Sequence, residues 1–282
     1  MRTAYLVTGA GGPAGLALLD GLAERGCPVV GVDAAPGSTI VETVPFADDP
    51  TFVVEVLKVA ARHHVGVIVP TVSEELPPLA AAAFGRAGEP RIVVAMPGPV
   101  ATADDKWRTA RALGRAGVAV PRTVVAGTWS PAAVAPMLGA LFVSKPRRGR
   151  GGRGVALHGV PGDAPPPVTD DYVLQEYVPG DEYAVDLYAG ASGEPDAVVV
   201  LRKTTLAQGI VGNAVTVRRE EAADVAAVAG AAVAALGLAG PVDVDVRRRA
   251  DGTPVVLEVN ARFGALSRHA PEVVDAMLAA YP

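Results

Sequence analysis

Short apolar runs and segments of helical periodicity alternate through residues 1–100, and this alternation constrains the fold more than any other feature. Four runs have the length and composition of strands, at residues 4–8, 28–32, 65–70 and 91–95. Between them, residues 50–64 place apolar side chains such as Phe52 and Val56 on one helical face. Strands that alternate with helices predict a parallel sheet covered by helices on both faces.

The pattern changes after residue 100. Residues 102–117 predict a helix, with Thr102 or Asp104 as its N-cap, because either side chain can accept a hydrogen bond from a free amide of the first turn. Residues 141–158 predict a strand, a glycine-rich loop and a second strand. The Pro- and Gly-rich segment 159–171 predicts a surface loop and a subdomain boundary.

The remainder of the chain indicates an antiparallel α+β unit. It contains four or five strand-like runs, one Ala-rich helix at about 220–236, and a hairpin that turns at Asp251-Gly252. We therefore expect an α/β region followed by an α+β region.

Composition excludes several classes of protein. The net charge of −5 provides no global basic field, so nucleic acid is not an expected partner. The single cysteine, Cys27, excludes an internal disulfide framework and any CxxC metal site. Residues 225–242 carry no charge, but Gly237, Gly240 and Pro241 interrupt them, which favours a buried helix over a membrane span. No secretory signal follows the N-terminus, so we expect a cytoplasmic protein.

The segment TGAGGPAG, residues 8–15, matches the TGxxGxxG form of a nucleotide-binding turn, and Asp33 ends the second strand-like run. Short-chain dehydrogenases with such a turn pair a catalytic Tyr with a Lys four residues later, and no tyrosine of this chain has Lys at that position. A glycine turn also follows the first strand of many parallel α/β domains that bind nothing. An NAD-dependent oxidoreductase therefore remains only an alternative.

Residues 145–155, KPRRGRGGRGV, combine four glycines with four arginines. A flexible glycine loop can bring backbone N–H groups close to phosphate oxygens, and the arginines add positive charge. The same composition suits an exposed basic hairpin tip, so the segment alone leaves both interpretations open.

A turn at Pro179-Gly180 interrupts the strands of residues 173–189. Backbone groups of such a turn can pair with the edge of an adenine. Glu182, seven residues after Gln175, can accept hydrogen bonds from ribose hydroxyls. A plain hairpin with solvent-facing acids is the alternative.

Three oxygen-bearing side chains lie on the two strands of the last hairpin: Asp245, Glu258 and Asn260. Glu258 and Asn260 are two residues apart and share one face of a strand whose apolar neighbours indicate burial. Buried carboxylates need partners, and hard oxygen ligands suit Mg²⁺ bound together with phosphates. Arg262 shares that side and could meet a transferring phosphoryl group.

From about residue 102 to 264 the chain resembles an ATP-grasp enzyme. It is most similar to the ATP-binding domain of the carbamoyl-phosphate synthetase large chain and to small amino-acid ligases such as the pyrrolysine-pathway ligase. The matching pieces occur in the family's order: DDKWRTARALGRAGVAVPRT, SKPRRGRGGRGV, LQEYVPGDEYAVD and GPVDVDV followed by LEVNARFG. The turn at 9–15 then resembles the family's Rossmann-like N-terminal domain, which does not use it for NAD.

The resemblance implies a Rossmann-like N-terminal domain followed by a two-subdomain ATP-grasp fold, with boundaries at 1–100, 101–170 and 171–282. It assigns ATP contacts to Lys106, Lys145, Arg150, Gly151, Gly152, Gln175, Glu176, Tyr177, Val178 and Glu182. It assigns metal ligands to Asp245, Glu258 and Asn260, with Asp243 as an alternative to Asp245. Arg262 is the candidate catalytic residue, and Arg202 or Lys203 would hold a substrate carboxylate. Lys106 and Lys145 are two of only four lysines in a chain with 25 Lys and Arg in total, so both sites depart from its preference for Arg.

The implied activity is ATP-dependent carboxylate–amine ligation through an acylphosphate, with an amino-acid-like substrate. The expected cofactors are ATP and Mg²⁺, with Mn²⁺ able to replace it. The expected partners are small carboxylates and amines, and neither nucleic acid nor membrane. Many relatives continue for longer beyond the segment that corresponds to Arg262. A homodimer is therefore possible, and the resemblance leaves the oligomeric state open. The alternatives are the NAD-dependent oxidoreductase and a catalytically inactive ATP-binding protein.

Overall fold

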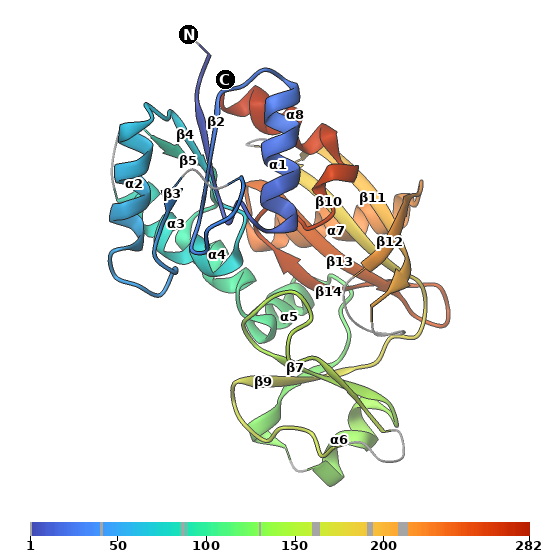
Figure 1. Cartoon of the computed structure of the whole chain (residues 1–282). Helices are drawn as coiled ribbons and strands as arrows, with labels where there is room; N and C mark the ends of the chain where they lie inside the picture. Colours follow the sequence, from blue (N-terminus) through green and yellow to red (C-terminus); the bar gives the residue numbers. More distant parts are fainter. Residues whose placement is uncertain are drawn as a thin grey trace.

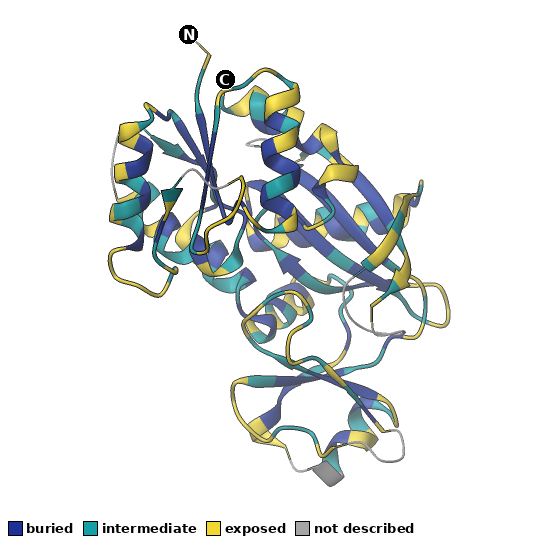
Figure 2. Cartoon of the chain, viewed as in Figure 1, coloured by how far each residue is buried: buried dark blue, intermediate teal, exposed yellow. Residues whose placement is uncertain are grey.

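The computed structural model describes residues 2–39, 42–85, 88, 90–129, 131–159, 164–190, 194–207 and 214–282. Figure 1 shows three sheets, with the smallest one projecting from the rest of the molecule. In Figure 2 the buried residues concentrate along the strands of the two larger sheets. No helix in these described ranges has both the length and the apolar character needed to cross a bilayer.

The first sheet is parallel, as the alternation of strands and helices predicts, and its strand order is β3-β2-β1-β4-β5. Its strands are β1 (Tyr5–Thr8), β2 (Val29–Asp33), β3 (Glu42–Thr43), β4 (Val67–Val69) and β5 (Arg91–Ile92). Three helices accompany it: α1 (Pro13–Glu24), α2 (Phe52–Arg62) and α3 (Leu76–Phe84). Successive residues of β1 face opposite sides: Leu6 packs with α2 and α3, whereas Tyr5 and Val7 pack with α1 and the C-terminal part of the chain.

The helix expected at 102–117 is two helices, α4 (Pro97–Ala103) and α5 (Lys106–Arg115). The cap is neither Thr102 nor Asp104: Asp105 adopts an extended backbone, and its carboxylate accepts from the amides of Trp107 at 3.0 Å and Arg108 at 3.2 Å. The chain therefore bends just before Lys106, which begins α5.

The second sheet has four antiparallel strands in the order β6-β9-β7-β8, with α6 (Pro131–Leu138) packed against it. The strands are β6 (Thr123–Val125), β7 (Phe142–Pro146), β8 (Ala156–His158) and β9 (Tyr172–Glu176). The glycine-rich segment connects β7 to β8. Because β9 pairs with β6 and β7, a boundary at 170 would divide this sheet, and a boundary after Glu176 keeps it whole.

The third sheet is antiparallel, in the order β12-β11-β10-β13-β14. Its strands are β10 (Glu182–Ala189), β11 (Pro195–Leu206), β12 (Ala214–Arg219), β13 (Gly240–Arg248) and β14 (Pro254–Asn260). On one face it buries apolar residues against α7 (Ala223–Leu236), α4 and α5. The other face packs partly against α8 (Pro271–Ala280) and α1, and the rest of that face carries the polar site.

Three short 3₁₀ turns complete the described elements, at Ser73–Glu75, Ala126–Thr128 and Ser267–His269.

Candidate active site

The register of the third sheet sets oxygen-bearing side chains beside one another. Asp245 on β13 pairs with Glu258 on β14, and Asp243 pairs with Asn260. Residues two apart on a strand share a face, so all four lie on the face opposite α7. The structure thus brings together the three side chains that the sequence proposes as metal ligands.

Burial and neighbouring charges separate the two aspartates. Burial alone would raise the pKa of Asp245, but the Lys203 ammonium, 2.6 Å away, lowers it below the ordinary value. Burial and the nearby carboxylate of Asp245 raise the pKa of Asp243 to about 6, although Arg262 donates to Asp243 at 3.0 Å. At neutral pH, Asp245 is therefore the more firmly ionised carboxylate.

Lys203 on β11 occupies the centre of the charged face. Its Nζ lies 2.6 Å from Asp245 and 2.8 Å from Glu182, and its side chain is only 8% exposed. Burial would lower the pKa of Lys203, but these two carboxylates raise it above its usual range. The ammonium is consequently held in its charged form.

The structure does not bring Arg202 to this face. Successive residues of β11 point to opposite sides of the sheet, and Arg202 bonds to Asp181 at 2.7 Å and lies 3.6 Å from Glu220 on the α7 side. Of the two residues expected to hold a substrate carboxylate, Arg202 is therefore directed away from the acidic face. Of the two neighbours, only Lys203 faces the cavities described below.

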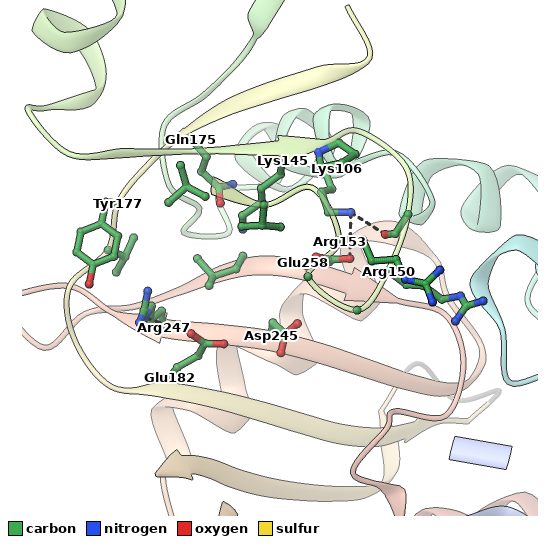
Figure 3. A pocket seen from close by; sticks show the side chains of 18 of the residues that line it. Lys106, Lys145, Arg150, Arg153, Gln175, Tyr177, Glu182, Asp245, Arg247 and Glu258 are labelled. Carbon is green, nitrogen blue, oxygen red and sulfur yellow. Dashed lines mark hydrogen bonds and ion pairs between the residues drawn. The ribbon is translucent and has the colours of Figure 1, made fainter. Parts of the chain in front are cut away.

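Lys106 and Lys145 approach Glu258 from other parts of the chain (Figure 3). Lys106, the first residue of α5, places its Nζ 3.2 Å from Glu258 and donates to the carbonyl of Gly149 at 3.0 Å. Lys145 lies on β7, and burial together with Lys106 lowers its pKa against the attraction of Glu258. Two cations and a carboxylate therefore meet where the second and third sheets face each other.

A cavity of about 110 Å³ lies between these two sheets. All ten residues assigned to ATP line it: Lys106, Lys145, Arg150, Gly151, Gly152, Gln175, Glu176, Tyr177, Val178 and Glu182. Its free volume is smaller than the several hundred Å³ of typical ligand pockets. The loop between β7 and β8 forms one wall, and the Lys106 ammonium donates a hydrogen bond to its Gly149 carbonyl.

Hydrogen bonds and ion pairs hold the C-terminal end of β9 in place. Gln175 is buried and donates from Nε2 to the Thr123 hydroxyl at 3.1 Å. The backbone N–H of Glu176 donates to the Arg122 carbonyl at 2.8 Å. The Glu176 carboxylate pairs with Arg249 and Arg122, which lower its pKa against the effect of burial. Arg249 belongs to the hairpin of the third sheet, so this ion pair joins the two walls of the cavity.

The glycine-rich loop itself adopts conformations that other residues disfavour. Gly151 and Gly152 have φ values of 68° and 67°, in the left-handed region. Arg150 in the same loop pairs with Glu74 of the N-terminal region at 2.7 Å. The loop therefore contacts both this cavity and the first part of the chain.

A second cavity, of about 510 Å³, lies on the other side of the loop and of the metal-ligand candidates. Arg150, Gly151, Gly152, Arg153, Lys203, Asp245 and Glu258 line both cavities. Asp243, Asn260 and Arg262 line only the larger one of the two. The glycine turn of residues 8–15 also lines it, through Gly9 and Gly12.

Sequence reasoning missed two buried groups on the charged face. Arg247 lines the smaller cavity, 5.3 Å from the ring centre of Tyr177 and 3.3 Å from Glu182. Asp186 is 3% exposed and pairs in register with Asp243. Burial and Asp243 raise the pKa of Asp186 well above its ordinary value. The available signal was an even spacing along a strand, two residues from Asp245 to Arg247 and four residues from Glu182 to Asp186 on β10.

The donor set for a cation contains two carboxylates and one amide, from Asp245, Glu258 and Asn260. Within the described ranges, no cluster of three or more His, Cys, Asp or Glu side chains forms a metal site. The set is nevertheless of the hard-oxygen type that Mg²⁺ accepts when phosphates complete its coordination. The residues present therefore fit Mg²⁺ held jointly with a nucleotide.

Several solved structures share the fold of this chain. The fold is shared with L-amino acid ligase from Bacillus licheniformis, at 18% identity and a TM-score of 0.66, over 95% of this chain and 69% of that one. It is also shared with N5-carboxyaminoimidazole ribonucleotide synthetase from Thermotoga maritima, at 20% identity and a TM-score of 0.65, over 93% of this chain and 69% of that one. Biotin carboxylase from Campylobacter jejuni aligns over 97% of this chain and 68% of its own, at 13% identity and a TM-score of 0.68.

A search among curated protein sequences finds no match. The model of the ATP-grasp domain family matches residues 103–266, which is more than half of the chain and includes both lysines, the glycine-rich loop and the acidic face. The chain belongs to the ATP-grasp family.

Proposed function

We propose that this protein is an ATP-dependent carboxylate–amine ligase that forms an amide or peptide bond through an acylphosphate. The observation that carries the proposal is the shared wall between the two cavities. Lys203, Asp245 and Glu258 face both of them, so a phosphoryl group held at this wall can pass from a nucleotide on one side to a carboxylate on the other. The proteins named above as L-amino acid ligase and ribonucleotide synthetase support a ligase reaction of this class.

The smaller cavity would hold ATP. The Glu176 amide is already bonded to Arg122, so the Glu176 carbonyl and the Val178 amide are the backbone groups that we assign to adenine. Glu182 would accept the ribose hydroxyls, with Arg247 and Lys203 balancing its charge. Lys106 and Lys145 would neutralise the phosphates.

The proposed metal ligands are Asp245, Glu258 and Asn260. Asp245 is preferred to Asp243 because it is the more firmly ionised carboxylate and lies opposite Glu258, whereas Asp243 is bonded to Arg262. The Asn260 amide nitrogen donates to Asp243 at 3.4 Å, so its oxygen would face the cation. When bound, Mg²⁺ would offset the negative charge of the phosphates.

The reaction requires little covalent chemistry from the protein. A carboxylate oxygen attacks the γ-phosphorus, the bond from that phosphorus to the bridging oxygen breaks, and ADP leaves. The amine then attacks the acyl carbon, phosphate leaves and the amine loses a proton. The chain contributes position and charge: we propose that Arg262 holds the carboxylate or the phosphoryl group, and that Lys203, rather than Arg202, is its cationic partner.

The architecture supports a Rossmann-like N-terminal domain over residues 1–100, given the parallel order β3-β2-β1-β4-β5. We propose the ATP-grasp subdomains at 101–176 and 177–282, moving the second boundary to keep β9 in its sheet.

ADP release, screened over pools of amino acids and amines with mass spectrometry of the products, tests the function. We expect Mg²⁺-dependent ADP formation that requires both a carboxylate and an amine, with one amide formed per ADP. The proposal is contradicted if the protein forms no amide with any pool, or if it binds NAD(H) in preference to ATP.

A further inference from the structure

The second sheet and α6 form a unit that joins the rest of the chain through two connecting segments, residues 116–122 before β6 and residues 177–181 after β9. Figure 1 shows this unit projecting from the other two sheets. The smaller cavity lies between the unit and the third sheet. The contacts that hold the unit in place therefore set the shape of this cavity.

At the loop end of the cavity, the unit is held by contacts with α5 and with the N-terminal region. The Lys106 amide donates to the Arg147 carbonyl at 2.9 Å, and Arg150 pairs with Glu74 at 2.7 Å. In Figure 3, Arg150 and Tyr177 lie at opposite sides of the cavity. The turn that follows β9 therefore needs anchors of its own.

The hairpin of β13 and β14 supplies such anchors and bonds to both connecting segments. In the first segment, the Ala119 carbonyl accepts from the Val256 amide at 2.9 Å. In the second, the Gly180 amide donates to the Arg248 carbonyl at 2.8 Å, and the Arg248 amide donates to the Asp181 carbonyl at 2.9 Å. A Cβ on Gly180 would lie 2.3 Å from the Arg248 carbonyl oxygen, so this approach requires glycine.

Arg249, which follows β13, adds a side-chain contact at each segment. Its guanidinium bonds to both carboxylate oxygens of Glu176, the last residue of β9, and donates from Nη2 to the Val120 carbonyl at 3.3 Å. Arginine presents its donors in a rigid planar fork, so the pair fixes the orientation of the carboxylate as well as its distance. Among the described residues, Glu176 lines the cavity and Arg249 does not. An effect of Arg249 on a nucleotide would therefore pass through Glu176.

We propose that Arg249 is a positioning residue for base recognition: by holding the Glu176 carboxylate, it keeps the Glu176 carbonyl and the Val178 amide aligned with the adenine edge. The inference rests on the adenine placement in the proposed function and extends it to a residue outside the cavity. A hydrogen bond weakens steeply when donor and acceptor move out of line. A strand end that can shift would consequently discriminate poorly between bases.

Two nucleotides that differ by one group test this role without turnover. They are the β,γ-imido analogue of ATP and the same analogue of purine riboside triphosphate, which lacks the 6-amino group that would donate to the Glu176 carbonyl. Isothermal titration calorimetry of the full chain with Mg²⁺ gives the ratio of the two affinities. We expect the wild-type protein to bind the ATP analogue roughly tenfold more tightly, and Arg249→Met to reduce this preference to about twofold. A wild-type protein without this preference, or an unchanged preference in Arg249→Met, overturns the inference.

Arg248→Met is the matched control, because it removes the preceding arginine of the same hairpin. The Arg248 guanidinium pairs with Asp224 on α7 at 2.6 Å and donates to the Gly252 carbonyl at 2.8 Å, so its side chain is directed away from the cavity. Its backbone bonds to residues 180–181 remain in the variant. We expect Arg248→Met to keep the wild-type preference, and an equal fall in both variants would refute a specific role for Arg249.

A double-variant cycle tests whether Arg249 acts through Glu176. Glu176→Gln keeps the backbone carbonyl and removes the charge that the guanidinium holds, so it should lower the preference in the same direction without burying an unpaired carboxylate. Combining it with Arg249→Met should weaken binding of the ATP analogue no more than Arg249→Met alone. Losses that multiply in the double variant contradict the proposed route.

The two proposals fail differently. If the preference falls in Arg249→Met and not in Arg248→Met, but no amide forms with any pool, the positioning role stands and the ligase function is wrong. If ADP and an amide form while the wild-type protein and both variants share one preference, the ligase function stands and the positioning role is wrong.

Discussion

Lys203→Met, compared with Arg202→Met, tests the electrostatic centre of the site with two adjacent residues. Lys203 is 8% exposed and holds two carboxylates, Asp245 at 2.6 Å and Glu182 at 2.8 Å. Arg202 is 30% exposed, and its partner Asp181 is 47% exposed. The two changes remove one positive charge each, so burial is the main difference between them.

Removing one partner of a buried ion pair leaves an uncompensated charge and costs about 3 kcal/mol, a factor of roughly 150 in the folding equilibrium. Arg247 still faces Glu182 at 3.3 Å and limits the loss at that carboxylate. The exposed pair of Arg202 is worth about 1 kcal/mol or less. We therefore expect a clearly lower urea midpoint for Lys203→Met and a nearly unchanged one for Arg202→Met, with ATP turnover lost only in the former.

The difference in stability between the wild-type protein and Lys203→Met should change with pH in a defined direction. Lys203 lowers the pKa of Asp245, so this part of the stabilisation is present above the ordinary aspartate pKa and is lost as pH falls through the lowered value. The carboxylates raise the pKa of Lys203, so its part is present below the ordinary lysine pKa and is lost only as pH rises through the raised value. The stability gap between the wild-type protein and Lys203→Met should be widest near neutral pH and close in acid. Equal losses in both variants, or a gap that widens in acid, would refute the reasoning.

Three further predictions concern the nucleotide and the metal. Glu258→Gln or Asn260→Ala should abolish Mg²⁺-dependent ATP turnover while circular dichroism shows a folded protein, and near wild-type turnover would exclude that residue as a ligand. Lys145→Ala should weaken binding of a fluorescent ATP analogue far more than Lys58→Ala, because Lys58 is 57% exposed on α2 and pairs with the neighbouring Glu55; similar small effects would count against the proposed nucleotide cavity. We expect the loop 147–154 to lift when ATP enters the small cavity and then to close, so trypsin should cut it quickly in the free protein and slowly with an ATP analogue and Mg²⁺. Cleavage rates that the analogue leaves unchanged, or that NAD slows instead, would contradict this closure.

Much of the fold followed from periodicity. Alternating strands and helices predicted the parallel sheet, and the two-residue spacing of Glu258 and Asn260 predicted their shared face. The ten residues that the family resemblance assigns to ATP line one cavity. Local patterns do not say which distant segments of the chain meet, so this grouping came from the resemblance.

Other features depended on geometry that local patterns do not fix. Asp104 and Asp105 have the same side chain, so the sequence alone does not say which of them caps the helix. The structure has Asp105 as the cap, and its carboxylate also accepts from Arg147 at 2.5 Å, 42 residues away in the chain. Arg202 and Lys203 are neighbours, and only the strand register decides which one faces the acids. The sequence also did not fix which groups the glycine turn bonds: in the structure the Gly11 amide donates to Asp33 and the Gly12 amide donates to the Gly9 carbonyl.

The most direct test of the central claim follows the oxygen atoms. Amino acids labelled with ¹⁸O in their carboxylates would be incubated with the enzyme, MgATP and amines, and the released phosphate analysed by mass spectrometry. An acylphosphate intermediate predicts that each phosphate released with an amide carries one oxygen from the carboxylate, and that the nucleotide product is ADP. Unlabelled phosphate, or AMP with pyrophosphate, would contradict it.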